Sequence, residues 1–375
     1  MSAVFKGPHL REVARVPVRG DRFAVRGNQL IVGSLHAEPP RELTVVDVST
    51  PDRAEVKAKL PFKYPISVVQ LVGDVVYVYE YKRAIHLVRM DGVTPVRFDC
   101  HLMFGKDVSI LAAVGSHWLV AARKWQGIVS VLDVVDPTRP IETDALELGT
   151  SSVESLVVVG DRVFVAASRS GLVELRIDVN GKLIEVARWF GGDRFRVDRV
   201  FAIGGELWVF GEGTLPYEPP ADGAAGEPAD EDPDEDTDDY EYEEANQEPN
   251  TLIFSLEDVG GAPAWIGTNP VRPAHLSPMV GGGAIALESY RCWHFPRAEK
   301  AKLLFERWET RPDGNGADGQ RAYVESADRH DGRHVVKDAA ACWVRRGEHL
   351  ILQEPEELVI YAIAPESPLA AMAEE

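Results

Sequence analysis

Short apolar runs separated by turn residues recur along the chain, and residues 155–190 show the pattern most clearly. Apolar residues at 156–159 and 163–167 flank a Gly160-Asp161 pair, and an Asn180-Gly181 pair separates the alternating run 172–177 from the run 183–189. Gly-Asp and Asn-Gly pairs favour the tight turns that join antiparallel strands. The stretch therefore predicts four consecutive short strands of one antiparallel sheet.

The first half of this pattern is a signature of one apolar residue, a glycine, a polar residue and, after one or two residues, an apolar run. Seven copies of it centre on Gly27, Gly73, Gly115, Gly160, Gly204, Gly282 and Gly347. The first five copies are 42–46 residues apart, and the last two follow after 78 and 65 residues. Four-stranded repeats of about 40–45 residues are typical of propeller blades. The sequence therefore predicts an all-β fold, a single seven-bladed β-propeller of four-stranded antiparallel blades. The blades are expected to start near residues 22, 67, 109, 153, 198, 277 and 340.

A second strand pattern follows the glycine signature, most clearly in residues 43–62 and 129–149, where an alternating strand ends in Asp-x-x-x-Pro. Proline cannot donate to a strand ladder and fixes a turn. The whole unit resembles the LVIVD-repeat family of β-propellers, whose repeat joins a V-x-G-x-x-A/V-Y-V-A hairpin to a G-L-x-V-x-D-V-S-x-P strand and turn. Residues 43–51 and 171–178 carry the resemblance best. It implies a fold and says little about activity.

The two ends of the chain complement each other. The last repeat stops one strand short, after residues 358–368, whereas residues 9–18 form an additional strand pattern before the first repeat. We expect residues 9–18 to be the outer strand of the last blade, paired with residues 358–363. Such pairing would close the ring and leave no long sheet edge open.

Composition agrees with a fold of many short strands. Glycine (32) and proline (25) are frequent, and no apolar run approaches the roughly 18 residues of a membrane span. The first residues contain no apolar segment of signal-peptide length, so we expect a soluble, cytoplasmic protein without a membrane partner. The three cysteines, Cys100, Cys292 and Cys342, are far apart and form no CxxC pair, which argues against a disulfide framework or a zinc knuckle.

The net charge of -20 is concentrated in one insertion. Residues 216–250 contain 15 of the 60 acidic residues and no basic one. Their low hydrophobicity and self-repelling charge predict disorder in the free protein. Three interpretations compete. The segment is a solubilising loop, it lies across a basic face as a mimic of an acidic ligand, or it is a docking segment with Tyr240 and Tyr242 as anchors.

The predicted blades have two different faces. Tight turns join the first strand to the second and the third to the fourth, so both kinds of turn lie on one face. The loops between the second and third strands, and the connections between blades, lie on the other. Both long insertions, 216–250 and the polar loop 310–338, belong to this loop-rich face. Because functional residues gather in loops on a rigid scaffold, we expect the loop-rich face to carry the function.

The expected loops of this face are rich in basic and aromatic residues. They contain Lys63, Tyr64, Tyr81, Lys82, Arg83, Arg123, Lys124, Trp125, Arg169, Arg194, Arg196, Arg272, Tyr290 and Arg291. Such a surface suits phosphate, carboxylate or a nucleic-acid strand, although a solvated rim uses the same residues. A sequence pI near 5.0 disfavours nucleic acid.

Candidate catalytic and metal-binding residues are few. His330, Asp331 and His334 lack a further ligand, and Asp313, Asn315 and Asp318 resemble a glycine-rich linker as much as a calcium loop. The alternating aspartates at 230, 232, 234 and 236 resemble an EF-hand, but Glu235 occupies the position where a glycine is needed. The sequence contains no G-x-S-x-G, H-E-x-x-H or phosphate-loop motif. We therefore assign no catalytic residue, metal or cofactor.

These observations favour a non-catalytic scaffold or adaptor subunit that binds a protein partner through the loop-rich face. One alternative is a metal-dependent hydrolase or lyase with its site at the mouth of the propeller channel. A second alternative is polyanion or nucleic-acid binding through the basic loops, which predicts a steep dependence on salt.

Overall fold

A computed structural model describes most of the chain, and the statements below concern these residues. They are residues 10–18, 20, 22–34, 40–81, 83–102, 108–136, 139–190, 195–203, 206–213, 250–255, 264–269, 277–278, 284–288, 291–295, 302–306, 343–346, 348–353 and 357–371. Within them, no helix has the length and hydrophobicity that crossing a membrane requires.

The described strands form seven four-stranded sheets, and every neighbouring pair of strands is antiparallel. The first four sheets contain β2 (Arg22–Arg26), β3 (Gln29–Gly33), β4 (Arg41–Asp47) and β5 (Glu55–Phe62); β6 (Ile66–Val72), β7 (Val75–Glu80), β8 (Ala84–Asp91) and β9 (Thr94–Leu102); β10 (Val108–Val114), β11 (Trp118–Arg123), β12 (Ile128–Asp133) and β13 (Ile141–Glu147); and β14 (Ser155–Val159), β15 (Arg162–Ala166), β16 (Leu172–Ile177) and β17 (Leu183–Trp189).

The remaining sheets continue in chain order. They contain β18 (Phe195–Ile203), β19 (Glu206–Gly213), β20 (Asn250–Ser255) and β21 (Ala264–Asn269); β22 (Ser277–Pro278), β23 (Ala284–Glu288), β24 (Arg291–Phe295) and β25 (Lys302–Glu306); and β26 (Trp343–Arg346), β27 (His349–Gln353), β28 (Leu358–Ile363) and β1 (Leu10–Val16). Short 3-10 helices lie at η1 (Pro51–Arg53), η2 (Lys124–Gln126) and η3 (Pro368–Ala371). The predicted all-β fold of four-stranded antiparallel sheets is confirmed.

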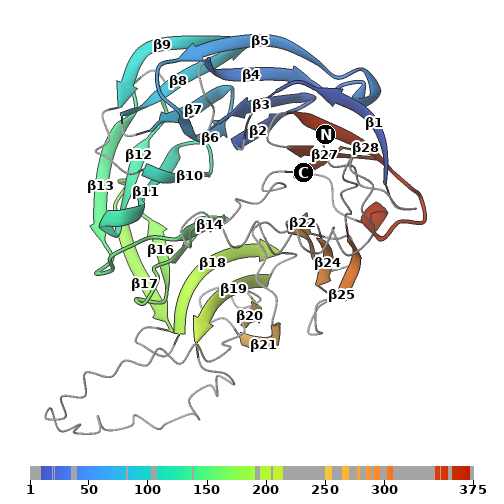
Figure 1. Ribbon diagram of the computed structural model, residues 1–375. Helices are drawn as coiled ribbons and strands as arrows, with labels where there is room; N and C mark the ends of the chain where they lie inside the picture. Colours follow the sequence, from blue (N-terminus) through green and yellow to red (C-terminus); the bar gives the residue numbers. More distant parts are fainter. Residues whose placement is uncertain are drawn as a thin grey trace, which may run out of the picture.

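The sheets are arranged in chain order around a common centre (Figure 1). The first and last strands of the chain meet in one sheet, because β1 pairs with β28 from Leu10 opposite Ile363 to Val16 opposite Leu358. The side chain of Arg15 on β1 also forms an ion pair with Glu357, just before β28. The N-terminal strand therefore lies beside the strand with which the sequence predicted that it would pair.

The tight turns follow from their residues. Gly73 and Gly160 adopt positive φ angles of 58° and 65°, a conformation that costs a glycine little, so β6–β7 and β14–β15 are joined by two-residue turns. In the turns between third and fourth strands, the aspartate accepts a hydrogen bond from the backbone two residues later, as Asp47 does from Ser49 and Asp133 from Val135. The aspartate of the Asp-x-x-x-Pro pattern is thus a turn cap.

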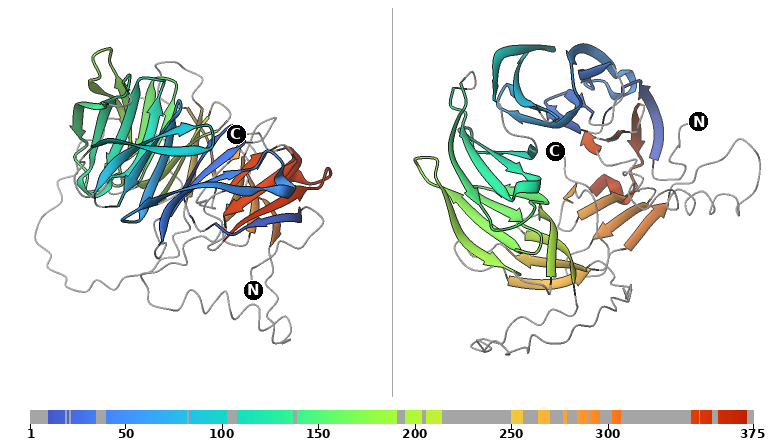
Figure 2. Two further views of the ribbon diagram at one scale, coloured as in Figure 1. Left: turned by 90° about the horizontal axis from the view of Figure 1, so that it is seen from above. Right: turned by 60° about the vertical axis from the view of Figure 1, so that its left-hand side comes forward.

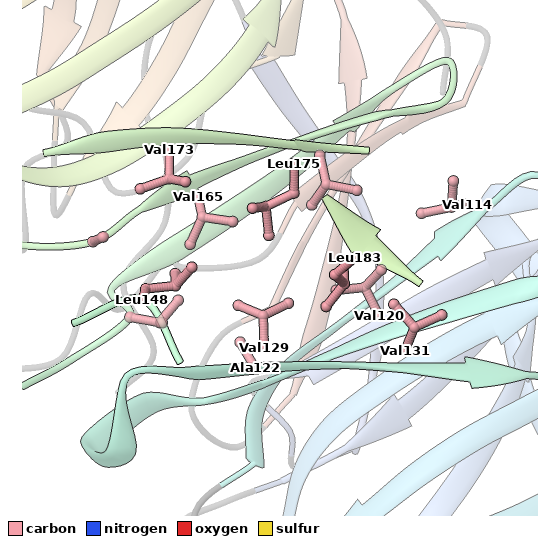
Figure 3. Close-up of a cluster of buried hydrophobic side chains, with 13 residues drawn as sticks. Val114, Val120, Ala122, Val129, Val131, Leu148, Val165, Val173, Leu175 and Leu183 are labelled. Carbon is pink, nitrogen blue, oxygen red and sulfur yellow. The ribbon is translucent and has the colours of Figure 1, made fainter. Parts of the chain in front are cut away.

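The core lies between neighbouring sheets and consists largely of valine and leucine. Between the third and fourth sheets, Val129 of one sheet lies opposite Val165 and Val173 of the next (Figure 3). These β-branched side chains fit a pleated surface that is buried on both faces. The inter-sheet contacts hold neighbouring loops in fixed relative positions.

The outer edge of each sheet is irregular. The pairing of third with fourth strand shifts register in all seven sheets, for example between Val131 and Leu132 in the third and between Glu174 and Leu175 in the fourth. A bulge bends an edge strand and interrupts its row of free backbone groups, which hinders edge-to-edge association.

Candidate interaction surface

The loop-rich face is formed by two kinds of connection, as the alternating strand directions require. Connections between second and third strands include the described residues 81 and 83 and the helix η2. Connections between neighbouring sheets include residues 63–65 and 148–154. Figure 2 (left) shows the sheets turned by 90° from the view of Figure 1. The predicted residues Lys63, Tyr64, Arg83, Lys124 and Trp125 all lie in these connections.

Tyr64 lies at the centre of a small cationic cluster between the first and second sheets. The guanidinium carbon of Arg83 is 4.4 Å from the centroid of the Tyr64 ring, and the Lys63 Nζ is 5.4 Å from it. Arg83 Nη2 also donates a hydrogen bond of 2.7 Å to the Tyr64 hydroxyl. Cation–π attraction and this hydrogen bond together hold the two positive groups at one aromatic ring.

Glu80, at the end of β7, fixes the position of this cluster by binding the backbone of Lys63 and Tyr64. Its side chain is buried, and Oε1 accepts hydrogen bonds from the backbone N–H groups of Lys63 at 2.9 Å and Tyr64 at 2.8 Å. Oε2 lies 3.0 Å from the His86 Nε2. Burial raises the pKa of Glu80, but the hydrogen bonds from Tyr64, His86 and Lys63 outweigh it, so the pKa is lowered overall.

The low pKa of Glu80 predicts an acid-sensitive contribution to stability. Because the folded protein binds this proton less readily than the unfolded chain, the contribution is present above the usual glutamate pKa and is lost as the pH falls through the folded-state value. We expect Glu80→Gln to lower the free energy of unfolding by about 1–3 kcal/mol at pH 7 and to lose less further stability below pH 5 than the wild type. Urea unfolding at pH 7 and pH 4 measures both effects. Glu147→Gln, at an exposed carboxylate on β13, is the control and should follow the wild type; an equal acid loss in Glu80→Gln would contradict the assignment.

A second group of predicted residues surrounds Glu154, where the third, fourth and fifth sheets meet. Lys124 Nζ lies 2.7 Å from Glu154 Oε2 and 5.0 Å from the Trp125 ring centroid. Arg196, on β18, is 4.0 Å from Glu154 and 2.8 Å from Asp198, which is 3% exposed. Burial raises the pKa of Glu154, but the hydrogen bonds from Lys124 and Ser152 outweigh this effect, so the pKa is lowered overall and the carboxylate stays ionised.

Trp125 is the most exposed aromatic side chain among the described residues of this face. It is 68% exposed at the tip of η2, and Tyr81, in the corresponding loop of the second sheet, is 39% exposed. The chain leaves η2 through Gly127, which has a φ of 62° and is next to the Thr150 carbonyl. The loop is therefore held tightly while its tryptophan projects into solvent.

The structure brings some of the predicted site residues together and leaves others apart. Lys63, Tyr64 and Arg83 come together, and so do Lys124, Trp125 and Arg196, whereas Arg123 pairs with Glu142 at 3.0 Å. Arg169 is exposed in the loop between β15 and β16 of the fourth sheet. Lys82, Arg194, Arg272, Tyr290, Tyr240 and Tyr242 lie outside the described residues, and Arg291 is described only as part of β24. Residues 216–249 and 310–338, including the candidate metal ligands, also lie outside them. The described part of the chain contains no group of three or more potential metal ligands.

The buried carboxylates Glu80 and Asp198, and the partly buried Glu154, did not appear among the predicted site residues. Each is a single acidic residue within or beside an apolar strand, which gives no motif. Glu154 and Asp198 do share one sequence signal, since both lie six residues before a repeat glycine, and Ser67 occupies the same place in the second repeat. Aligning the repeats on these glycines would have marked the position as polar.

Comparison with known proteins identifies the fold and no family. No protein-family model matches the chain, and no curated protein matches it either. A Lactobacillus plantarum protein of solved structure has a TM-score of 0.54 and 12% identity over 77% of this chain and 84% of its own. A Bacteroides uniformis protein provisionally named a 6-phosphogluconolactonase has a TM-score of 0.54 and 11% identity over 76% and 86%. A computationally designed protein has a TM-score of 0.53 and 10% identity over 96% and 100%. At these identities the likeness is one of fold alone, and the chain has the all-β, propeller-like fold of these structures.

Proposed function

We propose that the chain is a single seven-bladed β-propeller of LVIVD-like repeats that acts as a non-catalytic scaffold or adaptor subunit. The seven four-stranded sheets and the pairing of β1 with β28 support the closed ring. Such a disc offers a broad, rigid face, and its loops bind the partner protein.

The observation that carries this proposal is the exposure of Trp125 on a loop that is itself fixed. Solvent exposure of a tryptophan is unfavourable, and burial against a partner recovers that free energy with little loss of conformational entropy when the loop is already ordered. The contact of Lys124 with Glu154, and the hydrogen bond from the Val153 N–H to the Lys124 carbonyl, order this loop. Tryptophan, tyrosine and arginine are the residues that most often dominate binding energy at interfaces.

The proposal is tested by asking whether substitutions on the loop-rich face abolish binding of a partner protein. We expect the double variant Trp125→Ala, Tyr81→Ala to lose a protein that the wild type retains from native lysate. The affinity of the variant for that purified protein should be weaker by about 30-fold or more, because buried aromatic anchors contribute about 2 kcal/mol or more. Isothermal titration measures the affinity. The matched control is Val135→Ala, Val179→Ala, which removes exposed apolar side chains from turns of the opposite face. Equal capture by both variants would rule out the loop-rich face as the binding surface.

A further inference from the structure

The cations of the loop-rich face differ in how their charge is balanced, and this difference locates a subsite within the proposed scaffold function. Arg123 is paired with Glu142, Lys124 with Glu154, and Arg196 with Asp198. The Lys124 pair lies at a junction between sheets, whereas the pairs of Arg123 and Arg196 each lie within one sheet. A partner would have to compete with these carboxylates for all three cations.

Lys63 and Arg83 are different. In the described part of the chain, neither side chain lies within 4.0 Å of a carboxylate oxygen. Both are exposed and contact the same Tyr64 ring, and the nearby Glu80 is 6% exposed with both oxygens engaged by backbone N–H groups and His86. Two like charges at one ring repel each other, and an anion bound between them would relieve that repulsion.

The loops that present these groups are already fixed by hydrogen bonds. Arg83 N–H donates to the Glu80 carbonyl at 3.0 Å, and Tyr81 N–H donates to the Pro65 carbonyl at 2.8 Å. Together with the Glu80 side chain, these bonds tie the 63–65 connection to the end of β7. An anion would therefore meet a preformed pair of donors and would not have to order them.

We propose that Lys63, Tyr64 and Arg83 bind one side-chain carboxylate of an acidic segment in a partner protein, next to the exposed Tyr81. This inference rests on the proposed scaffold function. Charge complementarity supports it, because Lys63 and Arg83 bring two positive charges to one ring without a carboxylate of the described residues within 4.0 Å, and a single carboxylate matches two positive groups at one ring. A nucleic-acid backbone is a poorer match, since it presents a row of phosphates, whereas Arg123, Lys124 and Arg196 on this face are engaged by carboxylates.

The experiment uses the full-length chain and a fluorescein-labelled acidic probe, Gly-Glu-Glu-Leu-Glu-Glu-Gly, with binding followed by anisotropy at low salt. We expect Lys63→Gln, Arg83→Gln to weaken probe binding about tenfold or more, because it removes both charge-assisted contacts. The control Arg139→Gln, Lys182→Gln makes the same charge change in exposed turns of the opposite face and should stay within about twofold of the wild type. Tyr64→Phe, which keeps both charges but removes the hydroxyl that orients Arg83, should weaken binding about threefold.

Three outcomes would overturn the subsite. These are equal losses in both double variants, undiminished binding of the probe with glutamine in place of glutamate, and tighter binding of a phosphoserine probe or a deoxythymidine oligonucleotide than of the acidic probe. The scaffold proposal has a separate readout. One result would contradict the carboxylate subsite and leave the scaffold function supported. In that result, the variant Lys63→Gln, Arg83→Gln still captures a partner protein that the variant Trp125→Ala, Tyr81→Ala loses.

Discussion

Replacement of Glu174 by alanine is expected to lower the free energy of unfolding by about 3–5 kcal/mol, because it leaves the buried Arg162 guanidinium without its counter-charge. Glu174 and Arg162 are 2% and 7% exposed, on β16 and β15. Their two parallel hydrogen bonds, Nε to Oε1 and Nη2 to Oε2, are both 2.8 Å long. The guanidinium carbon also lies 4.7 Å from the Phe164 ring centroid, which places the charge within the aromatic part of the core.

The matched control is an ion pair of the same type at the surface of the same sheet. Arg188 and Glu185 on β17 form two hydrogen bonds of 2.9 Å, but both side chains are substantially exposed. We expect Glu185→Ala to cost less than about 1 kcal/mol. The double variant Arg162→Met, Glu174→Leu should be more stable than Glu174→Ala, since it removes the buried charge together with its partner. Urea unfolding measures all three, and a loss below about 1 kcal/mol in Glu174→Ala would show that the guanidinium reaches water.

Gly127→Ala is expected to destabilise the protein by about 2–5 kcal/mol and to displace the loop that carries Trp125. The residue has a φ of 62°, and a Cβ there would lie 2.0 Å from the Thr150 carbonyl oxygen, a contact that cannot form without backbone movement. Its own carbonyl accepts a hydrogen bond of 2.9 Å from the Leu148 N–H, so this movement would disturb the end of β13 as well.

Gly160→Ala separates the two causes of this effect. Gly160 has nearly the same backbone conformation, with a φ of 65°, but a Cβ there would meet nothing within 4 Å. We expect this variant to lose only the conformational term of about 1–2 kcal/mol. Thermal or urea unfolding gives the stabilities, and the quenching of Trp125 fluorescence by acrylamide reports on the loop. Equal losses in the two variants would mean that the approach to Thr150 contributes nothing.

Much of the fold could be predicted because its determinants are local. The glycines at 73 and 160 mark two-residue turns, and the apolar runs beside them form the paired strands of each hairpin. Residues 155–190 were predicted as four strands, and the structure contains β14, β15, β16 and β17 there. The register shifts of the outer strands were not predicted, since one extra residue in an edge strand leaves no mark in the hydrophobic pattern.

The candidate site could be predicted only as a set of residues on one face. The sequence placed Lys63, Arg83, Arg123, Lys124 and Arg196 there because loops of the same class emerge on the same side of a propeller. It treated them as equivalent, since nothing near them in the chain distinguishes one cation from another.

The sequence by itself determined the all-β class, the repeating hairpins and the side of the sheets on which the basic and aromatic residues gather, because strand alternation and turn chemistry depend on neighbours in the chain. Only the tertiary structure decided which cations are balanced. Glu142 pairs with Arg123 within one sheet, and Glu154 pairs with Lys124 at a junction between sheets. The buried Glu80 instead accepts a hydrogen bond from the backbone N–H of Tyr64. Electrostatic pairing depends on distances in space, and the packing of the sheets sets those distances.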